Sequence, residues 1–249
     1  MLIAPYIPTK YSLKSTDESI EVLKLREWKG LLASLDAQSL FTNVPIDETI
    51  DIIVNYAYHH PSLPPPVIPS GLLKEMLSAC TKEAPFRSPE GRLYLQVDGI
   101  AMGSPLGVLF AESYMTAVEA KALESLDEEP YVYCRYLDDI FVDIKDESSL
   151  QCLKQQLELN SVLSFTTEMG DGHSLAFLDV GINAPSGKFL TSVYRKPTNT
   201  GHCLNGKSEC PERYKLSVTR AYIYSPCSEA LRNVAARSPG ARAGAPDSG

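Results

Sequence analysis

The chain alternates between short apolar runs and segments in which apolar residues recur every three or four positions. The spacing of three or four residues predicts helices at 46–57, 70–80, 106–126 and 149–159. It also predicts an earlier helix that starts near Thr16 and is ended by Gly30. The short runs predict these strands: 31–35, two within 86–97, 163–167, 176–182 and 189–194. Because most strands are joined by hairpin-length turns, the sequence predicts an α+β fold, with an antiparallel sheet covered on one face by helices.

One strand-like stretch, residues 131–142, is interrupted by two adjacent acidic residues, Asp138 and Asp139. Burying two ionised carboxylates side by side without partners is costly. A β-hairpin with Leu137 and the two aspartates at its tip would instead present the carboxylates to solvent or to bound cations. Most such dipeptides are ordinary Asp-Asp turns, so other residues must decide between the two interpretations.

Two other features point to the same chemistry. Asp36 follows the apolar run 31–35, and the end of that strand can lie beside the hairpin tip in one sheet. Divalent cations such as Mg²⁺ prefer oxygen ligands, and two of them can clamp the attacking and leaving oxygens of phosphoryl transfer. The small-residue loop 99–106, which leads into a helix, would let a large planar group approach the backbone closely.

Composition restricts the class of protein. With 249 residues, 44% hydrophobic and 22% charged, the chain is typical of globular proteins and long enough for one large or two small domains. No segment has the uninterrupted apolar length of a membrane span, and no secretory signal is recognised at the start. We therefore expect an intracellular protein that is not secreted and has no membrane partner. The net charge of −8 counts against an autonomous nucleic-acid binder.

The six cysteines are scattered and form no CxxC pair, which favours free thiols. His202-Cys203 with Cys210 and Cys227 could be read as zinc ligands, but their spacing fits no common zinc pattern. No zinc site is expected.

Three segments resemble, in order, the motifs of reverse transcriptases of Penelope-like retroelements. Residues 35–45 resemble the first catalytic motif, residues 96–106 the template- and nucleotide-positioning motif, and residues 135–142 the metal-binding hairpin. Three shorter segments continue the pattern: 165–168, 177–180 and 193–198. The resemblance covers about residues 5–221.

The resemblance implies a polymerase palm-like fold with partial fingers. Residues 1–35 would be a remnant of the fingers region, and residues 36–224 a reverse transcriptase palm-like domain. Residues 225–249, rich in Ala, Arg, Pro, Gly and Ser, are expected to be a disordered tail.

The resemblance also implies an activity. The protein would be an RNA-directed DNA polymerase that transfers deoxynucleotides from their triphosphates to a DNA primer 3′-hydroxyl, on an RNA template, with Mg²⁺ or possibly Mn²⁺ as cofactor. The catalytic and metal-binding residues would be Asp36, Asp138 and Asp139. The nucleotide-binding residues would be Ala37, Phe41, Met102, Gly103 and Ser104. The primer or template contacts would be Gln96, Tyr136, Leu137, Phe177, Leu178, Arg195 and Lys196. Core packing is an alternative role for Phe41, and solvation an alternative for the two basic residues.

The sequence departs from the family pattern in two places. Only 35 residues precede Asp36, where the family has longer fingers, and Cys210 stands where the family usually has His before Pro211. We also expect no room for a full thumb or a GIY-YIG endonuclease domain. A catalytically inactive retroelement-derived fragment or binding module is therefore an alternative, as is another two-metal phosphotransferase that uses the same aspartates. The family implies access to the nucleus, although no basic localisation cluster is evident.

Overall fold

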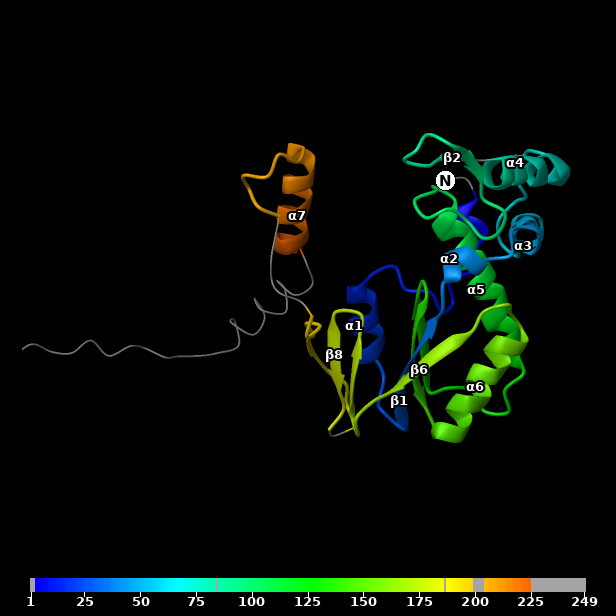
Figure 1. Ribbon diagram of the computed structural model, residues 1–249. Helices are drawn as coiled ribbons and strands as arrows, with labels where there is room; N and C mark the ends of the chain where they lie inside the picture. The colour runs from blue at the N-terminus through cyan, green and yellow to red at the C-terminus, as the bar shows by residue number, and fades with distance from the viewer. Residues whose placement is uncertain (1–2, 84, 186, 199–203, 225–249) are drawn as a thin grey trace, which may run out of the picture.

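The computed structural model of the protein describes residues 3–83, 85–185, 187–198 and 204–224 (Figure 1). At its centre is a four-stranded antiparallel sheet with the strand order β4-β5-β1-β6. These strands are β1 (Leu31–Ala37), β4 (Val132–Tyr136), β5 (Asp139–Ile144) and β6 (Phe165–Met169). The predicted α+β class with an antiparallel sheet is confirmed.

Helices cover one face of this sheet. Alternate residues of β1 point to opposite faces, and Ala33, Leu35 and Ala37 share a buried core with Phe110 and Leu153. Phe110 lies on α5 (Gly107–Glu124) and Leu153 on α6 (Glu147–Leu159), and α3 (Ile46–Tyr58) packs against α5. The predicted covering of one face by helices therefore rests on α5 and α6.

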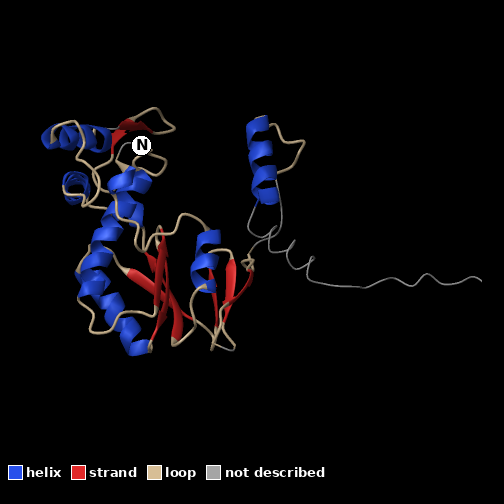
Figure 2. Ribbon diagram, turned by 180° about the vertical axis from the view of Figure 1, so that it is seen from behind, coloured by secondary structure: helices blue, strands red, loops and turns tan. Residues whose placement is uncertain are grey.

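The opposite face of the sheet has a second core. Leu32 and Phe141 pack there with Leu23 and Leu175. Leu23 belongs to α1 (Thr16–Lys24), and Leu175 to a separate three-stranded antiparallel sheet, visible beside the main sheet in Figure 2. Its strands are β7 (Ser174–Phe177), β8 (Val180–Asn183) and β9 (Leu190–Val193). The two sheets thus enclose a layer that the helices α5 and α6 do not reach.

Further elements extend the fold beyond the two sheets. Near the upper end of α5 in Figure 1 are α2 (Leu40–Asn43), α3, α4 (Ser70–Lys82), and the hairpin of β2 (Pro85–Arg87) and β3 (Leu93–Leu95). A short 3₁₀ helix, η1, spans Ala4–Tyr6, and α7 spans Glu212–Tyr224. Figures 1 and 2 both draw α7 apart from the two sheets.

Two predicted elements were wrong in detail. The first helix ends at Lys24, and Gly30 instead leads into β1, where its backbone lies against the carbonyl group of Ile144. The single strand predicted over 176–182 is two strands, β7 and β8, because Leu178 adopts a positive φ of 55° that turns the chain back. The predicted boundary between residues 35 and 36 falls inside β1.

Some predictions concern residues that the structure does not describe. The predicted disordered tail, 225–249, lies outside the described residues, and so do three of the four weighed zinc ligands, His202, Cys203 and Cys227. The cysteines that the structure describes are free thiols: Cys80, Cys134, Cys152 and Cys210. Within the described ranges, no helix is both long enough and apolar enough to cross a membrane.

Candidate active site

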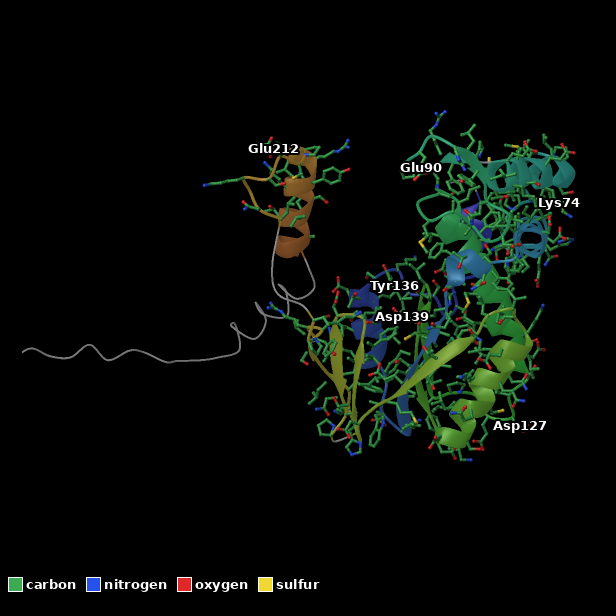
Figure 3. All side chains as sticks on the ribbon, in the orientation of Figure 1. Lys74, Glu90, Asp127, Tyr136, Asp139 and Glu212 are labelled. Carbon is green, nitrogen blue, oxygen red and sulfur yellow. The ribbon has the colours of Figure 1, made fainter. Side chains whose placement is uncertain are left out.

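Strand register brings the predicted acidic residues to one end of the sheet. Asp36, near the end of β1, lies directly opposite Asp139, the first residue of β5. Tyr136 pairs with Asp139 across the β4–β5 hairpin, so Leu137 and Asp138 form its two-residue turn. Figure 3 shows Tyr136 and Asp139 together at this end of the sheet.

The hairpin tip is also tied to β1 by a main-chain hydrogen bond. The amide of Ala37 donates to the carbonyl oxygen of Asp138 at 3.0 Å. Leu137 has a positive φ of 55°, a conformation that is uncommon outside glycine and is found where a tight turn requires it. The bond joins Ala37 to Asp138, which are more than a hundred positions apart in the sequence. It thereby holds Asp138 and Asp139 of the hairpin close to Asp36 of β1.

The three aspartates repel one another. The pKa of Asp36 is raised, first by burial and then by the negative charge of Asp138. The pKa of Asp139 is raised to about 6 by burial, Asp138 and Asp36, and Lys196 opposes this shift only in part. The site therefore concentrates negative charge that a bound cation would neutralise.

Hard oxygen donors with excess negative charge suit a divalent cation such as Mg²⁺. In the part of the chain that the structure describes, no three His, Cys, Asp or Glu side chains already converge to hold a metal ion. Mg²⁺ is commonly bound by one or two carboxylates together with water and substrate phosphates, so an open carboxylate set is compatible with it. The donor chemistry fits, and further ligands would come from a bound substrate.

Gln38 is a site residue that sequence reasoning missed. Its side-chain amide donates to Asp36 Oδ2 and, at 3.2 Å, to Thr166 Oγ1 on β6. These bonds orient the Asp36 carboxylate across the β1–β6 pair. The signal was present in the strand periodicity, since a residue two positions after Asp36 continues on the same face.

A cavity of about 400 Å³ opens between the two sheets at this end of the molecule. Asp36 and Asp139 line it, together with Phe177, Leu178 and Lys196. The structure therefore brings these three predicted primer contacts to the aspartates. It does not do so for Arg195, whose exposed side chain is not part of the cavity lining.

The predicted nucleotide-binding residues on β1 and α2 lie inside or against the core. Ala37 is fully buried, and the half-buried ring of Phe41 packs beside Gly107 at the start of α5. The carbonyl oxygen of Phe41 accepts a 2.7 Å hydrogen bond from the amide of Ile100. This bond attaches the loop 99–106 to α2, the short helix that follows the strand carrying Asp36.

The loop itself is open. Met102 is 73% exposed, and Gly103 has a φ of 89° with no atom close to where a side chain would stand. The Ser104 hydroxyl accepts from the amide of Leu106 at 3.2 Å. None of these residues lines the cavity that contains Asp36 and Asp139.

The last three predicted contacts line other cavities. Gln96 donates to the carbonyl of Asp98 at 2.8 Å and lines a cavity of about 820 Å³ bordered by α2, α3 and α4. Tyr136 and Leu137 line a third cavity, of about 460 Å³, together with Pro105 from the loop before α5. The hairpin tip and this loop therefore meet, as a shared site would require.

Comparisons with known proteins were made for sequence and for fold. The family model described as "Reverse transcriptase (RNA-dependent DNA polymerase)" matches residues 1–169, more than half of the 249 residues. No protein with a curated description matches the sequence.

Two solved structures illustrate the likeness in fold. Apo telomerase from Candida tropicalis, truncated from the C-terminal domain, is 18% identical with a TM-score of 0.51, over 74% of this chain and 41% of that one. Telomerase from Candida albicans in complex with a TWJ fragment of telomeric RNA is 11% identical with a TM-score of 0.58, over 74% of this chain and 36% of that one. The chain spans less than half the length of either telomerase, and at these identities the likeness shows the fold alone.

Proposed function

Because the chain belongs to the reverse transcriptase (RNA-dependent DNA polymerase) family, we propose that it extends a DNA primer on an RNA template with deoxynucleotides. The observation that carries this proposal is the strand register, which sets Asp36 opposite Asp139 with Asp138 in the intervening turn. This arrangement collects carboxylates from two distant segments at the mouth of a cavity.

In this proposal, Asp36 and Asp138 are the metal ligands, and Asp139 adds negative charge. When bound, two Mg²⁺ or Mn²⁺ ions would stabilise the attacking and leaving oxygens of nucleotidyl transfer. Gln38 holds the Asp36 carboxylate in place, and the backbone of Ala37 holds the hairpin tip against β1. The protein supplies charge and positioning, which are the main requirements of phosphoryl-transfer chemistry.

Substrate contacts are assigned to the surrounding residues. Phe41 would lie beneath the incoming sugar and exclude a 2′-hydroxyl, and Met102, Gly103 and Ser104 would lie near the nascent base pair. The open backbone at Gly103 supports the close approach of a planar base. Gln96 would contact the template from the same loop region.

The primer would enter through the cavity between the two sheets. Phe177 and Leu178 supply an apolar wall beside the aspartates, and Lys196 supplies a positive charge for a backbone phosphate. Tyr136 and Leu137 would abut the primer end from the hairpin, and Arg195 would contact phosphate outside the cavity. Within the family, the ordered motifs favour a Penelope-like element, with access to the nucleus.

The test is primer extension by the recombinant chain on an RNA template with a labelled DNA primer, deoxynucleotides, and Mg²⁺ or Mn²⁺. We expect extension that falls at least about 100-fold in Asp138→Asn, because the substitution removes a charged ligand without changing side-chain volume. Asp127→Asn, an exposed aspartate at the far end of α5 (Figure 3), is the matched control.

Each outcome has a distinct meaning. Full activity in Asp138→Asn would refute the metal assignment. A parent protein that is folded by circular dichroism but extends no primer with either metal would indicate a catalytically inactive fragment. Binding of a labelled primer–template by such a protein, measured by fluorescence anisotropy, would identify it as a binding module.

A further inference from the structure

Strand β4 of the β4–β5 hairpin carries a buried cation, Arg135, whose side chain has no solvent exposure. Its Nε donates to Glu119 at 2.6 Å, and its two terminal nitrogens donate to the two carboxylate oxygens of Glu112, each at 3.2 Å. Both glutamates belong to α5. One terminal nitrogen also donates to the carbonyl oxygen of Leu137 at 2.9 Å.

We infer that Arg135 is a positioning residue that fixes the orientation of Asp138. The carbonyl of Leu137 belongs to the peptide group that precedes Asp138, and it accepts a hydrogen bond from the Arg135 guanidinium. The carbonyl of Asp138 belongs to the next peptide group, and the Ala37 amide holds it from β1. Both peptide groups around Asp138 are therefore fixed, which limits the directions that its carboxylate can take. The inference rests on the proposed function.

The backbone of Arg135 is held as firmly as its side chain. Its amide donates to the carbonyl of Tyr11 at 2.8 Å, and its carbonyl accepts from the amide of Leu13 at 2.7 Å. The Ser12 hydroxyl donates to Glu112 at 2.7 Å. Because both its backbone and its guanidinium are restrained, Arg135 cannot move away from the Leu137 carbonyl without breaking several buried or partly buried hydrogen bonds.

Stability alone does not explain such a cluster. Removing charges from water is expensive, and well-packed apolar residues in place of a buried ion pair are often neutral or stabilising. The guanidinium, however, offers several donors in a rigid planar fork, so one side chain can bind two carboxylates and a carbonyl at once. An apolar residue could fill the space, but it could not orient the turn.

The test compares Mn²⁺ affinity of the free protein, measured by electron paramagnetic resonance, in the parent and three variants. Arg135→Lys keeps the charge but has only three donors on one nitrogen, so it cannot reproduce the four hydrogen bonds that the guanidinium fork makes to Glu119, Glu112 and Leu137. Tyr133→Phe removes only the 2.9 Å bond from Tyr133 to Glu119, in the same cluster but not at the turn. Asp138→Asn removes a proposed ligand.

We expect Arg135→Lys to weaken Mn²⁺ binding at least about tenfold, the usual effect of losing a group that orients a metal ligand. Tyr133→Phe should change it less than about twofold, even though it also removes a hydrogen bond from the cluster. All measurements are made well below each variant's thermal midpoint. In primer extension, Arg135→Lys should lower kcat and leave the KM for deoxynucleotide unchanged.

The outcomes separate this inference from the proposed function. Unchanged Mn²⁺ affinity in Asp138→Asn would overturn the metal site itself. Weakened affinity in Asp138→Asn, with parent-like affinity in Arg135→Lys, would overturn the positioning role alone. Equal losses in Arg135→Lys and Tyr133→Phe would show general loosening of the core and would also overturn it. If Arg135→Lys does not fold, Glu112→Gln, on the partly exposed side of the cluster, takes its place, and unchanged affinity there overturns the inference.

Discussion

Replacing Asp139 with asparagine is expected to stabilise the metal-free protein at neutral pH. The pKa of Asp139 is raised from 3.8 to about 6 in the folded state by burial, Asp138 and Asp36. The folded state therefore keeps a proton on this carboxyl to a higher pH than the unfolded state does. The stability that this proton provides is fully present below 3.8 and is lost as the pH rises through 6. Asparagine cannot ionise and so escapes this loss.

The size of the effect follows from the shift. A change from 3.8 to about 6 corresponds to at most about 3 kcal/mol above pH 6. Because Asp139 is only half-buried, solvent screening reduces the expected gain to about 1 kcal/mol. For a domain of this length, that gain corresponds to a rise in Tm of about 2–4 °C.

The assay is thermal and urea denaturation of the parent and Asp139→Asn, with a chelator present, at about pH 4 and about pH 7.5. The gain in stability of Asp139→Asn should be present at the higher pH and absent at the lower one. Asp127→Asn should show no gain at either pH. Adding Mg²⁺ should then stabilise the parent more than the variant, because only the parent keeps the full carboxylate set. A gain that persists at about pH 4, or no gain at neutral pH, would refute the reasoning.

Three further substitutions test how the site is supported, each by urea denaturation. Gly30→Ala should lower the free energy of unfolding by about 2 kcal/mol, because a Cβ there would overlap the Ile144 carbonyl; Gly71→Ala, in open space on α4, should cost nothing. Gly99→Ala should lower the free energy of unfolding by about 1–3 kcal/mol, because its φ of 67° is unfavourable for alanine and its Cβ would overlap the main chain of Thr42. Gly91 has a φ of 86° but open space around it, so a loss in Gly99→Ala no larger than that in Gly91→Ala would contradict the crowding. Asp143→Ala should cost about 2–3 kcal/mol, because this buried carboxylate accepts from the amides of Lys29 and Gly30 at 2.9 Å each; a neutral result would show that water replaces it.

Local patterns predicted the elements that depend on local physics. The apolar spacing that predicted 46–57 and 106–126 corresponds to α3 and α5, because a helix buries one face at a fixed period. The apolar run broken by Asp138-Asp139 corresponds to the β4–β5 hairpin, because ionised carboxylates are not buried side by side. The break at Leu178 was missed, since a positive φ at a residue other than glycine leaves no mark in composition.

The sequence by itself determined the fold class, the hairpin and the candidate aspartates, since periodicity and the cost of buried charge act on neighbouring residues. Only the tertiary structure decided that Asp36 lies opposite Asp139, and that Phe177, Leu178 and Lys196 share their cavity while Arg195 and Met102 do not. It also decided the partners of Arg135, which lie 16 and 23 residues away on α5. Strand register and the pairing of buried charges arise from contacts between distant segments, and such contacts are set by the packing of the whole core.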